Sequence, residues 1–359
     1  MPDTDLTPYD AFLLISFGGP ESPDDVMPFL RNVTAGRNIP DSRLEAVAEH
    51  YHHFGGISPI NQQCRDLLAA IETDFADRGI GLPVYWGNRN WQPYLADTVR
   101  QMAADGVRRA LAFVTSAYSS QSSCRQYLDD IDLARAQAGP AAPRIDKIRQ
   151  YFNHPGFIEP LAAAAAAAAQ SLPEPVMNEA VLVFTAHSIP ASMAAASGPA
   201  GGAYPAQLAE AARLVAERVP GERPWRLAYQ SRSGSPAQPW LEPDISDSLT
   251  ELAVGGARAA VMIPSGFVSD HMEVKFDLDV EAAATAAELG LPVARAATPG
   301  TDPRFVAMIS ELVAERLTGA PRRVLGSMAA GCDTCPAGCC TGEPAERGPS
   351  GLPAARPAS

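Results

Sequence analysis

The chain has 359 residues, a length that suits two domains rather than one ordinary hydrophobic core. Its formal net charge of −13 argues against nucleic acid as a partner and disfavours docking on anionic lipid by charge alone. No apolar run approaches membrane-spanning length, and the acidic amino terminus lacks the basic region of a secretory signal. We therefore expect a cytoplasmic protein without stable membrane insertion.

Short apolar runs rich in β-branched residues alternate with helical stretches along the chain. The predicted strands are residues 12–17, 84–87, 110–116, 180–186, 226–230 and 259–264. The predicted helices include residues 23–33, 95–105, 207–218 and 244–254, and the alanine-rich run 161–170 favours a helix by propensity. Continuous apolar runs are typical of parallel strands buried on both faces. The alternation therefore predicts an α/β fold with parallel sheets.

The pattern runs twice, which predicts two doubly wound halves. We place the first domain at residues 1–151 and the second at 152–320, with the last helix, about 303–318, as a candidate to pack back on the first domain. A cysteine-rich tail follows at 321–342. Residues 343–359 are rich in Pro, Gly, Ala and Ser and are expected to be disordered. A ligand would sit where the carboxyl ends of strands from both halves converge.

His187 follows directly after a predicted buried strand, in the sequence Thr185-Ala186-His187-Ser188-Ile189-Pro190. This position places it at the carboxyl edge of the sheet, where α/β proteins bind their ligands. Histidine exchanges protons near neutral pH and ligates metals. A structural histidine at the end of a strand is the competing interpretation.

Three carboxylates, Glu273, Asp277 and Glu281, are spaced four residues apart after the last predicted strand. On a helix this spacing places them on one face, and such a hard-oxygen set suits transient binding of a divalent metal. A solvated acidic face has the same spacing. The run Asp270-His271-Met272-Glu273 favours the functional interpretation, because a solvated stripe would not normally begin directly after a buried strand.

Two glycine-rich turns, Phe17-Gly18-Gly19-Pro20 and Gly55-Gly56-Ile57-Ser58-Pro59, let the backbone approach a ligand closely. Neither has the spacing of a phosphate-binding loop. A nucleotide cofactor therefore has little support.

Four of the six cysteines, Cys332, Cys335, Cys339 and Cys340, fall within nine residues. In a large protein of this kind, clustered cysteines indicate a metal rather than disulfides, either structural zinc or an iron–sulfur cluster. Adjacent cysteines rarely both ligate one cluster easily, so a remote fourth ligand is plausible. Cys124 is the better candidate, because Cys64 has the pattern of a buried helix residue.

Several of these segments together resemble the ferrochelatase family over nearly the whole chain. They are the two glycine turns, Ala186–Pro190, Tyr229-Gln230-Ser231-Arg232, Pro239-Trp240-Leu241 and Gly266–Glu273, in that order. The resemblance implies two Rossmann-like domains, each with a parallel four-stranded sheet, and a porphyrin cleft between them. It also implies that His187 and Glu273 are catalytic and face each other across the cleft. These two residues, with Asp277 and Glu281, would form the path of the ferrous ion.

The segment 31–54 has no apolar run, and in this it resembles soluble bacterial members that convert coproporphyrin III into coproheme. Protoporphyrin IX is the alternative substrate. A further alternative activity is that of a cobalt or nickel chelatase acting on a related tetrapyrrole. Arg31, Arg37, Tyr51 and Ser58 are candidate donors to the propionates. The full set of expected porphyrin contacts is Phe17, Arg31, Tyr51, Ser58, Tyr118, Gln121 and Trp240. Phe17 stands where some members carry an iron-ligating tyrosine, and residues 87–90 lack the histidine of others.

The tail resembles the C-x2-C-x4-C arrangement of cluster-containing ferrochelatases, matched by Cys332, Cys335 and Cys340. The resemblance implies a [2Fe–2S] cluster ligated by these three and Cys124, with Cys339 as the alternative ligand. We expect a monomer whose partners are coproporphyrin III, Fe²⁺ and, transiently, the next haem-synthesis enzyme. Two hypotheses of another class stay open: a non-catalytic haem or porphyrin carrier, and an iron–sulfur sensor on the same fold.

Overall fold

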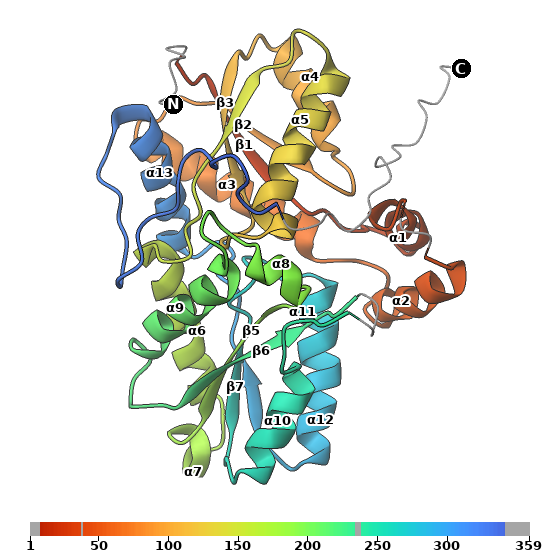
Figure 1. Ribbon diagram of the computed structural model, residues 1–359, viewed down its shortest axis with the longest axis vertical. Coiled ribbons are helices and arrows are strands. Elements are labelled where there is room, and N and C mark those ends of the chain that lie inside the picture. The colour runs from red at the N-terminus through yellow and green to blue at the C-terminus, as the bar shows by residue number, and fades with distance from the viewer. Residues whose placement is uncertain (1–7, 37–38, 234–237, 342–359) are drawn as a thin grey trace.

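The structure, a computed structural model, describes residues 8–36, 39–233 and 238–341. The described chain forms two α/β halves, one above the other in Figure 1, with the carboxyl-terminal segment running back along the first half. No helix in these ranges is long and apolar enough to cross a membrane. The residues for which disorder is predicted, 343–359, lie outside the described chain.

The first half is built on a parallel four-stranded sheet in the order β2-β1-β3-β4. Its strands are β1 (Ala11–Ser16), β2 (Val84–Asn88), β3 (Arg109–Val114) and β4 (Arg144–Lys147). All six residues of β1 are buried, as the continuous apolar run predicts. The helical elements of this half are η1 (Pro23–Asp25), α1 (Val26–Val33), α2 (Asp41–His53), α3 (Ile60–Asp77), α4 (Leu95–Ala104), η2 (Gln121–Arg125) and α5 (Gln126–Ala138).

The second half repeats the same strand order, as β6-β5-β7-β8. Its strands are β5 (Val181–His187), β6 (Trp225–Gln230), β7 (Ala260–Ile263) and β8 (Val293–Arg295). Its helical elements are α6 (Pro155–Gln170), α7 (Glu174–Met177), α8 (Ala191–Ala195), α9 (Ala203–Ala216), α10 (Ile245–Val254), α11 (Met272–Phe276), η3 (Asp277–Ala282), α12 (Ala283–Glu288) and α13 (Pro303–Thr318). The predicted α/β fold with two doubly wound parallel sheets is confirmed.

Two edge strands, β4 and β8, were absent from the sequence-based prediction. β4 has the sequence RIDK and only alternate residues buried, and β8 is three residues long. Neither carries the continuous apolar run that marks a central parallel strand. These two segments therefore become strands because they pair with β3 and β7 through backbone hydrogen bonds, which the local sequence does not indicate.

One hydrophobic core is shared by the two halves. It includes Phe12 and Phe113 from the first sheet, Phe184 from the second, and Phe157 and Phe305 from helices α6 and α13. The opposite face of each sheet packs on its own helices, α4 and α5 in the first half and α10 and α12 in the second. The shared core fixes the two sheets relative to each other.

Helix α13 and the tail tie the second half to the first. α13 packs on α3, where the Ser310 hydroxyl donates to the Asp74 carboxylate. Arg149 is almost fully buried and pairs with Glu315 of α13 at 2.7 Å. Beyond α13, the Leu325 amide donates to the Asn153 carbonyl at 2.8 Å. The bounds given above for the domains remain a prediction about where independent folding units begin and end.

Gly266 follows β7 and packs directly against β5 beside the predicted catalytic histidine. A Cβ at this position would lie 2.6 Å from the Cα of Ala186, a contact with backbone that cannot move away cheaply. We expect Gly266→Ala to lower the free energy of unfolding by about 1–3 kcal/mol through overpacking. Urea denaturation measures this change. Gly81→Ala is the matched control, because nothing lies within 4 Å of a Cβ there, and equal effects of both variants would contradict the prediction.

Candidate active site

His187 and Glu273 come together at the carboxyl edge of the second sheet. His187 ends the central strand β5, and Glu273 lies in the first turn of α11, which follows β7. The Nε2 of His187 and the Oε2 of Glu273 are 3.8 Å apart, and both side chains keep about a third or more of their surface exposed, 32% and 42%. The pair is therefore accessible to a substrate.

Backbone contacts fix the ring of His187. Its Nδ1 lies 2.5 Å from the carbonyl of Ser188, which can only accept, so Nδ1 carries the proton. In the neutral ring the lone pair is then on Nε2, the atom that faces Glu273. From the other side, the Tyr204 hydroxyl donates to the His187 carbonyl at 2.9 Å. The histidine is thus oriented as a proton acceptor.

His271 starts the helix that carries Glu273. Its Nδ1 accepts a hydrogen bond from the backbone amide of Glu273 at 3.2 Å, which caps α11. Burial lowers the pKa of His271, so the ring is neutral at physiological pH and keeps the lone pair that the cap needs.

Asp277 lies one turn beyond Glu273 and is largely buried. Burial is the main cause that raises its pKa to about 7; the carboxylates of Glu273, Glu281 and Asp244 contribute to this rise, and the hydrogen bond from Ser231 opposes it. Asp277 thus sits within the field of both other predicted acids. Glu281 is exposed at the far end of the series. The three carboxylates thus follow one another along this helix, with Glu273 next to His187 and Glu281 farthest along the chain.

The helix that carries these acids is not a regular α-helix. After α11 it widens at Asp277 into a π-helical segment, η3, and returns to α geometry in α12. The four-residue spacing predicts a uniform α-helix, and the structure corrects this. Such π segments are rare and occur frequently at functional sites.

The first half reaches this region through two contacts, one from α2 and one from α3. The ring of His50 from α2 stacks on Phe276 of α11, with the ring centroids 3.6 Å apart. The backbone amide of Asp270 donates to the side chain of Gln63 from α3 at 2.8 Å. These contacts hold the first half against the helix that bears Glu273.

Several residues expected to contact porphyrin lie near the catalytic pair or on the first-half side facing it. Trp240 pairs in an antiparallel bridge with Pro190, three residues after His187. Phe17 and Tyr51 both pack on Phe29 of α1, and burial raises the pKa of Tyr51, so its phenol stays neutral. Ser58 is buried, with its amide bonded to the Pro20 carbonyl.

Two expected polar contacts are engaged elsewhere. Arg31 is exposed and forms an ion pair with Asp41 at 2.9 Å. Tyr118 is only 2% exposed, and its hydroxyl donates to the Ser265 carbonyl at 2.9 Å, which joins the two halves. Tyr118 thus packs between the two halves, and its contact with porphyrin stays a prediction. Gln121 begins η2 and is part-exposed, and Arg37 lies outside the described residues.

The fold brings Cys124 to the cysteine tail. Its Sγ lies 3.7 Å from the Sγ of Cys335, although the two residues are 211 positions apart. Cys332 and Cys339 lie close enough to Cys335 to influence its electrostatics, and the Sγ atoms of Cys339 and Cys340 are 3.8 Å apart. Cys64 is buried in α3, as its pattern predicts.

The chemistry of this sulfur cluster fits a thiolate-ligated group. Two thiolates on one tetrahedral metal with bonds of about 2.3 Å lie about 3.8 Å apart, which matches the Cys124–Cys335 separation. Hydrogen bonding from Cys335 lowers the pKa of Cys124 and of Cys332 to about 6, toward the thiolate form that binds metals. Among the described residues, however, no group of three or more His, Cys, Asp or Glu side chains is preformed around a single ion.

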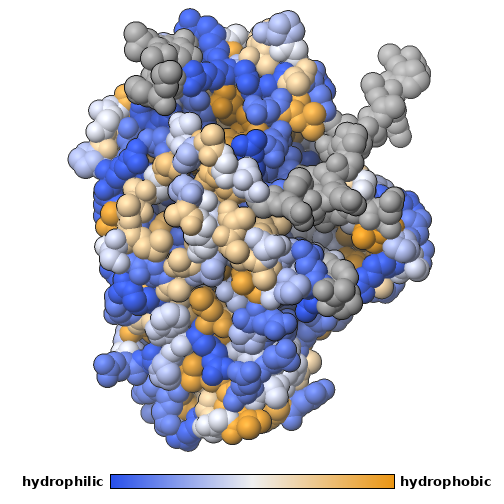
Figure 2. All heavy atoms as spheres, viewed as in Figure 1, coloured by the Kyte–Doolittle hydropathy of each residue, from blue (hydrophilic) through white to orange (hydrophobic). Residues whose placement is uncertain are grey.

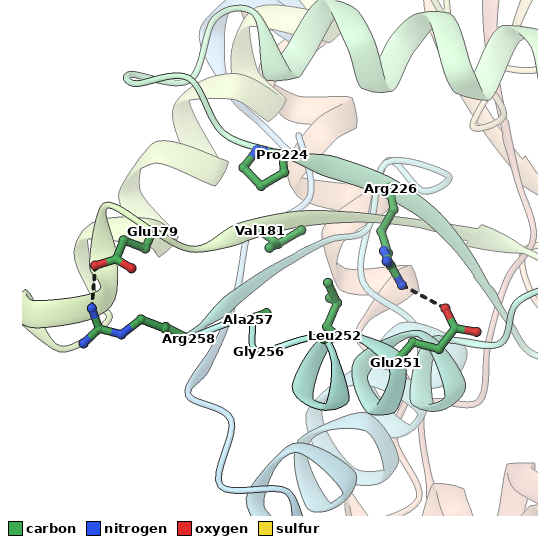
Figure 3. Close-up of a pocket in the computed structure, with 10 residues that line it drawn as sticks. Glu179, Val181, Pro224, Arg226, Glu251, Leu252, Gly256, Ala257 and Arg258 are labelled. Carbon is green, nitrogen blue, oxygen red and sulfur yellow. Dashed lines mark hydrogen bonds and ion pairs between the residues drawn. The ribbon is translucent and has the colours of Figure 1, made fainter.

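A separate pocket lies at the opposite, amino-terminal end of the second sheet (Figure 3). It opens between the starts of β5 and β6 and the loop after α10. Its two arginines are already paired, Arg226 with Glu251 at 3.0 Å and Arg258 with Glu179 at 2.6 Å. Both arginines of the pocket are therefore already neutralised by a carboxylate. The pocket lies at the start of β5, whereas His187 lies at the end of this strand.

Sequence reasoning missed Tyr204, Gln63 and Gln230 as neighbours of the site. Gln230 belongs to the segment Tyr229-Gln230-Ser231-Arg232, which resembles the ferrochelatase family. Its position at the end of a predicted strand could have indicated that it lies near the site. Tyr204 and Gln63 lie on helices without a distinguishing local pattern, so only the tertiary contacts reveal them.

The two similar α/β halves and the His–Glu pair at the sheet edge define a chelatase-like protein. A family model described as Ferrochelatase matches residues 9–317. The chain belongs to the ferrochelatase family. It is 55% identical to the coproporphyrin III ferrochelatase of Streptomyces griseus, with 94% of each chain covered. It is 59% identical to that of Frankia alni, over 92% of this chain and 86% of the relative.

A curated relative named Ferrochelatase, from Rhodopirellula baltica, is 52% identical over 94% of this chain and 95% of its own. Among solved structures, SirB from Bacillus subtilis with Fe³⁺ is similar in fold, with a TM-score of 0.54 at 12% identity. The match covers 85% of this chain and 96% of SirB. At this identity the likeness shows the fold alone.

The raised pKa of Asp277 predicts a pH-dependent stability. An aspartate whose pKa rises on folding destabilises the fold as pH increases from its ordinary value of 3.8 toward about 7, and the full penalty persists above that. We expect Asp277→Asn to increase the free energy of unfolding at pH 8 on the order of 2 kcal/mol, and about half as much at pH 5.5. Urea unfolding at both values measures this, and a gain independent of pH would contradict it.

Proposed function

We propose that this protein inserts Fe²⁺ into coproporphyrin III and releases coproheme and two protons. The observation that carries the proposal is the pair formed by His187 and Glu273, 3.8 Å apart at the sheet edge, with buried Asp277 behind it. Relatives at 55% and 59% identity that are named coproporphyrin III ferrochelatases support the substrate.

The orientation of His187 suits the removal of pyrrole protons. Two N–H protons must leave the macrocycle as the metal enters, so a base must stand beside the ring. Because Nδ1 is held by the Ser188 carbonyl, Nε2 is the atom that accepts a proton. The carboxylate of Glu273 stabilises the resulting imidazolium and passes the proton outward.

The acidic series supplies the iron. Carboxylate oxygens bind divalent cations, and the partial negative charge of Glu281, Asp277 and Glu273 attracts Fe²⁺ from solvent toward His187. The neutral imidazole neither repels the cation nor competes with it. Binding energy along the macrocycle is available to distort the ring so that nitrogen lone pairs point at the metal.

The lip formed by α1 and α2 supports a polar tetrapyrrole. Its apolar side chains, including Phe29, Leu30 and Leu44, are turned into a small core of their own. The exposed residues of α2 are mostly polar, and Figure 2 shows hydrophilic residues along the outer edge of this lip. Coproporphyrin III carries four propionates, and Arg31 is an exposed cation of this lip that can exchange Asp41 for one.

Anaerobic turnover with Fe²⁺ tests the substrate and the base together. We expect kcat/KM for coproporphyrin III to exceed that for protoporphyrin IX at least tenfold. His187→Ala is expected to lower kcat at least a hundredfold, because general-base catalysis contributes factors of about 10²–10⁴. Porphyrin binding, followed by quenching of its fluorescence, should persist in the variant.

Other outcomes of this experiment favour the alternatives. Preference for protoporphyrin IX would retain the enzyme and overturn the substrate. Porphyrin binding without metal insertion by the unaltered protein would indicate a carrier. Unchanged turnover in His187→Ala would exclude His187 as the base. Absence of both insertion and porphyrin binding in the unaltered protein would favour an iron–sulfur sensor on a chelatase fold.

A [2Fe–2S] cluster held by Cys124, Cys332, Cys335 and Cys340 is the second part of the proposal. The contact of Cys124 with Cys335 supports the remote ligand. Cys339 is the alternative fourth ligand, because its sulfur lies beside that of Cys340, which accepts from the Gly198 amide at 3.1 Å. When bound, the group would cross-link the tail to the first half. Iron insertion itself transfers no electron.

Replacing the remote ligand tests this assignment. Cys124→Ser should remove the visible absorption bands and acid-labile sulfide of the purified protein, because a hydroxyl is a poor ligand for the soft iron–sulfur unit. Cys64→Ser, at a buried cysteine of α3, is the matched control and should retain both. Absence of sulfide from the unaltered protein would exclude the cluster, and retention of full sulfide in Cys124→Ser would exclude this ligand.

Cytoplasmic location, a monomeric state and transient contact with the next haem-synthesis enzyme complete the proposal. The last follows from the product, since coproheme still carries propionates that a later enzyme must process.

A further inference from the structure

The residue that follows β6, Ser231, has a backbone conformation that serine rarely adopts. Its φ is 62°, in the left-handed region, and Cys340 is the only other described non-glycine residue with positive φ. Glycine occupies this region without the steric cost that a Cβ imposes. Strained residues of this kind cluster at functional sites. The position thus raises the question of what the serine side chain does.

The side chain of Ser231 binds an acid of the iron path. Its hydroxyl donates to Oδ2 of Asp277, 46 residues further along the chain. A glycine would satisfy the turn but would remove this hydrogen bond. The strain is therefore compensated by a contact with the largely buried carboxylate that stands between Glu273 and Glu281.

The preceding residue, Gln230, binds the same helix at two points. Its Nε2 donates to the backbone carbonyl of Glu273 at 2.8 Å and lies 3.4 Å from Oδ2 of Asp277. The side chain is almost fully buried, and its Oε1 has no hydrogen-bond partner among the described residues. In the sheet, Gln230 is the register partner of His187. One residue thus links the strand of the base to the helix of the acids.

The donors that hold Asp277 are neutral. The cations of the neighbouring segments are engaged elsewhere: Lys275 pairs with Asp279, Arg295 with Asp270 and Asp279, and Arg232 with Glu242. A cation on Asp277 would fix it equally well, but it would cancel the charge that attracts Fe²⁺. A hydroxyl and an amide orient the carboxylate and leave its charge available.

We propose that Gln230 and Ser231 are positioning residues that hold Glu273 and Asp277 in place for delivery of Fe²⁺ to His187. The inference rests on the proposed function. The inference assigns a role in metal delivery to Gln230 and Ser231, although neither bonds to the side chain of His187 or Glu273. Porphyrin binding depends on other residues.

The test separates the hydroxyl of Ser231 from its backbone strain. Ser231→Ala removes the hydroxyl and keeps the strain, whereas Ser231→Gly removes both. We expect both variants to raise KM for Fe²⁺ about tenfold, the effect of losing one hydrogen bond to a charged group. KM for coproporphyrin III should stay within about twofold of the unaltered protein, because the lost contact concerns the metal path. Ser233→Ala, an exposed serine of the same loop, is the matched control.

Gln230→Met provides the second measurement, since it keeps side-chain length without a donor. It should raise KM for Fe²⁺ at least as much as Ser231→Ala while the protein still binds coproporphyrin III, as fluorescence quenching reports.

Three results would overturn the inference: unchanged KM for Fe²⁺ in both serine variants, a defect in Ser231→Ala that Ser231→Gly relieves, or an equal loss of iron and porphyrin affinity. Failure of the unaltered protein to insert iron would instead overturn the proposed function.

Discussion

The burial of both faces of two parallel sheets is the constraint on which the rest of the structure depends. The central strands β1, β3 and β5 are mainly apolar and buried along almost their whole length, so helices must cover them on both sides. Helices α6 and α13 serve both sheets through one continuous core. This common packing fixes the carboxyl edge of the second sheet relative to the first half, and thereby places His187 and Glu273 where residues from both halves meet.

Electrostatics at that edge follow from the same packing. Carboxylates that would repel one another in solution are brought together after β7, and burial raises the pKa of Asp277 to about 7. Neutral donors from the end of β6 stabilise this arrangement. A cluster of acids next to His187 is costly to the fold, and it provides the attraction for a divalent cation that an enzyme of this family needs.

The carboxyl-terminal segment adds a second connection between distant parts of the chain. It passes along the segment between β4 and α6, where the Leu325 amide donates to the Asn153 carbonyl, and it brings Cys335 against Cys124. The sulfur of Cys340 also reaches the loop after α8, which follows the strand of His187. The cysteine tail is therefore part of the packed structure and is not an isolated appendage.

The sequence by itself determined the α/β class, the central strands and the residue types of the site. Continuous apolar runs and the residues directly after them are local features, so His187 and Glu273 could be predicted from position along the chain. The edge strands β4 and β8, the π-helical turn at Asp277 and the bonds from Gln230 were decided only by the tertiary structure. They depend on backbone pairing and on contacts between segments far apart in sequence, and no local pattern encodes the energy of such contacts.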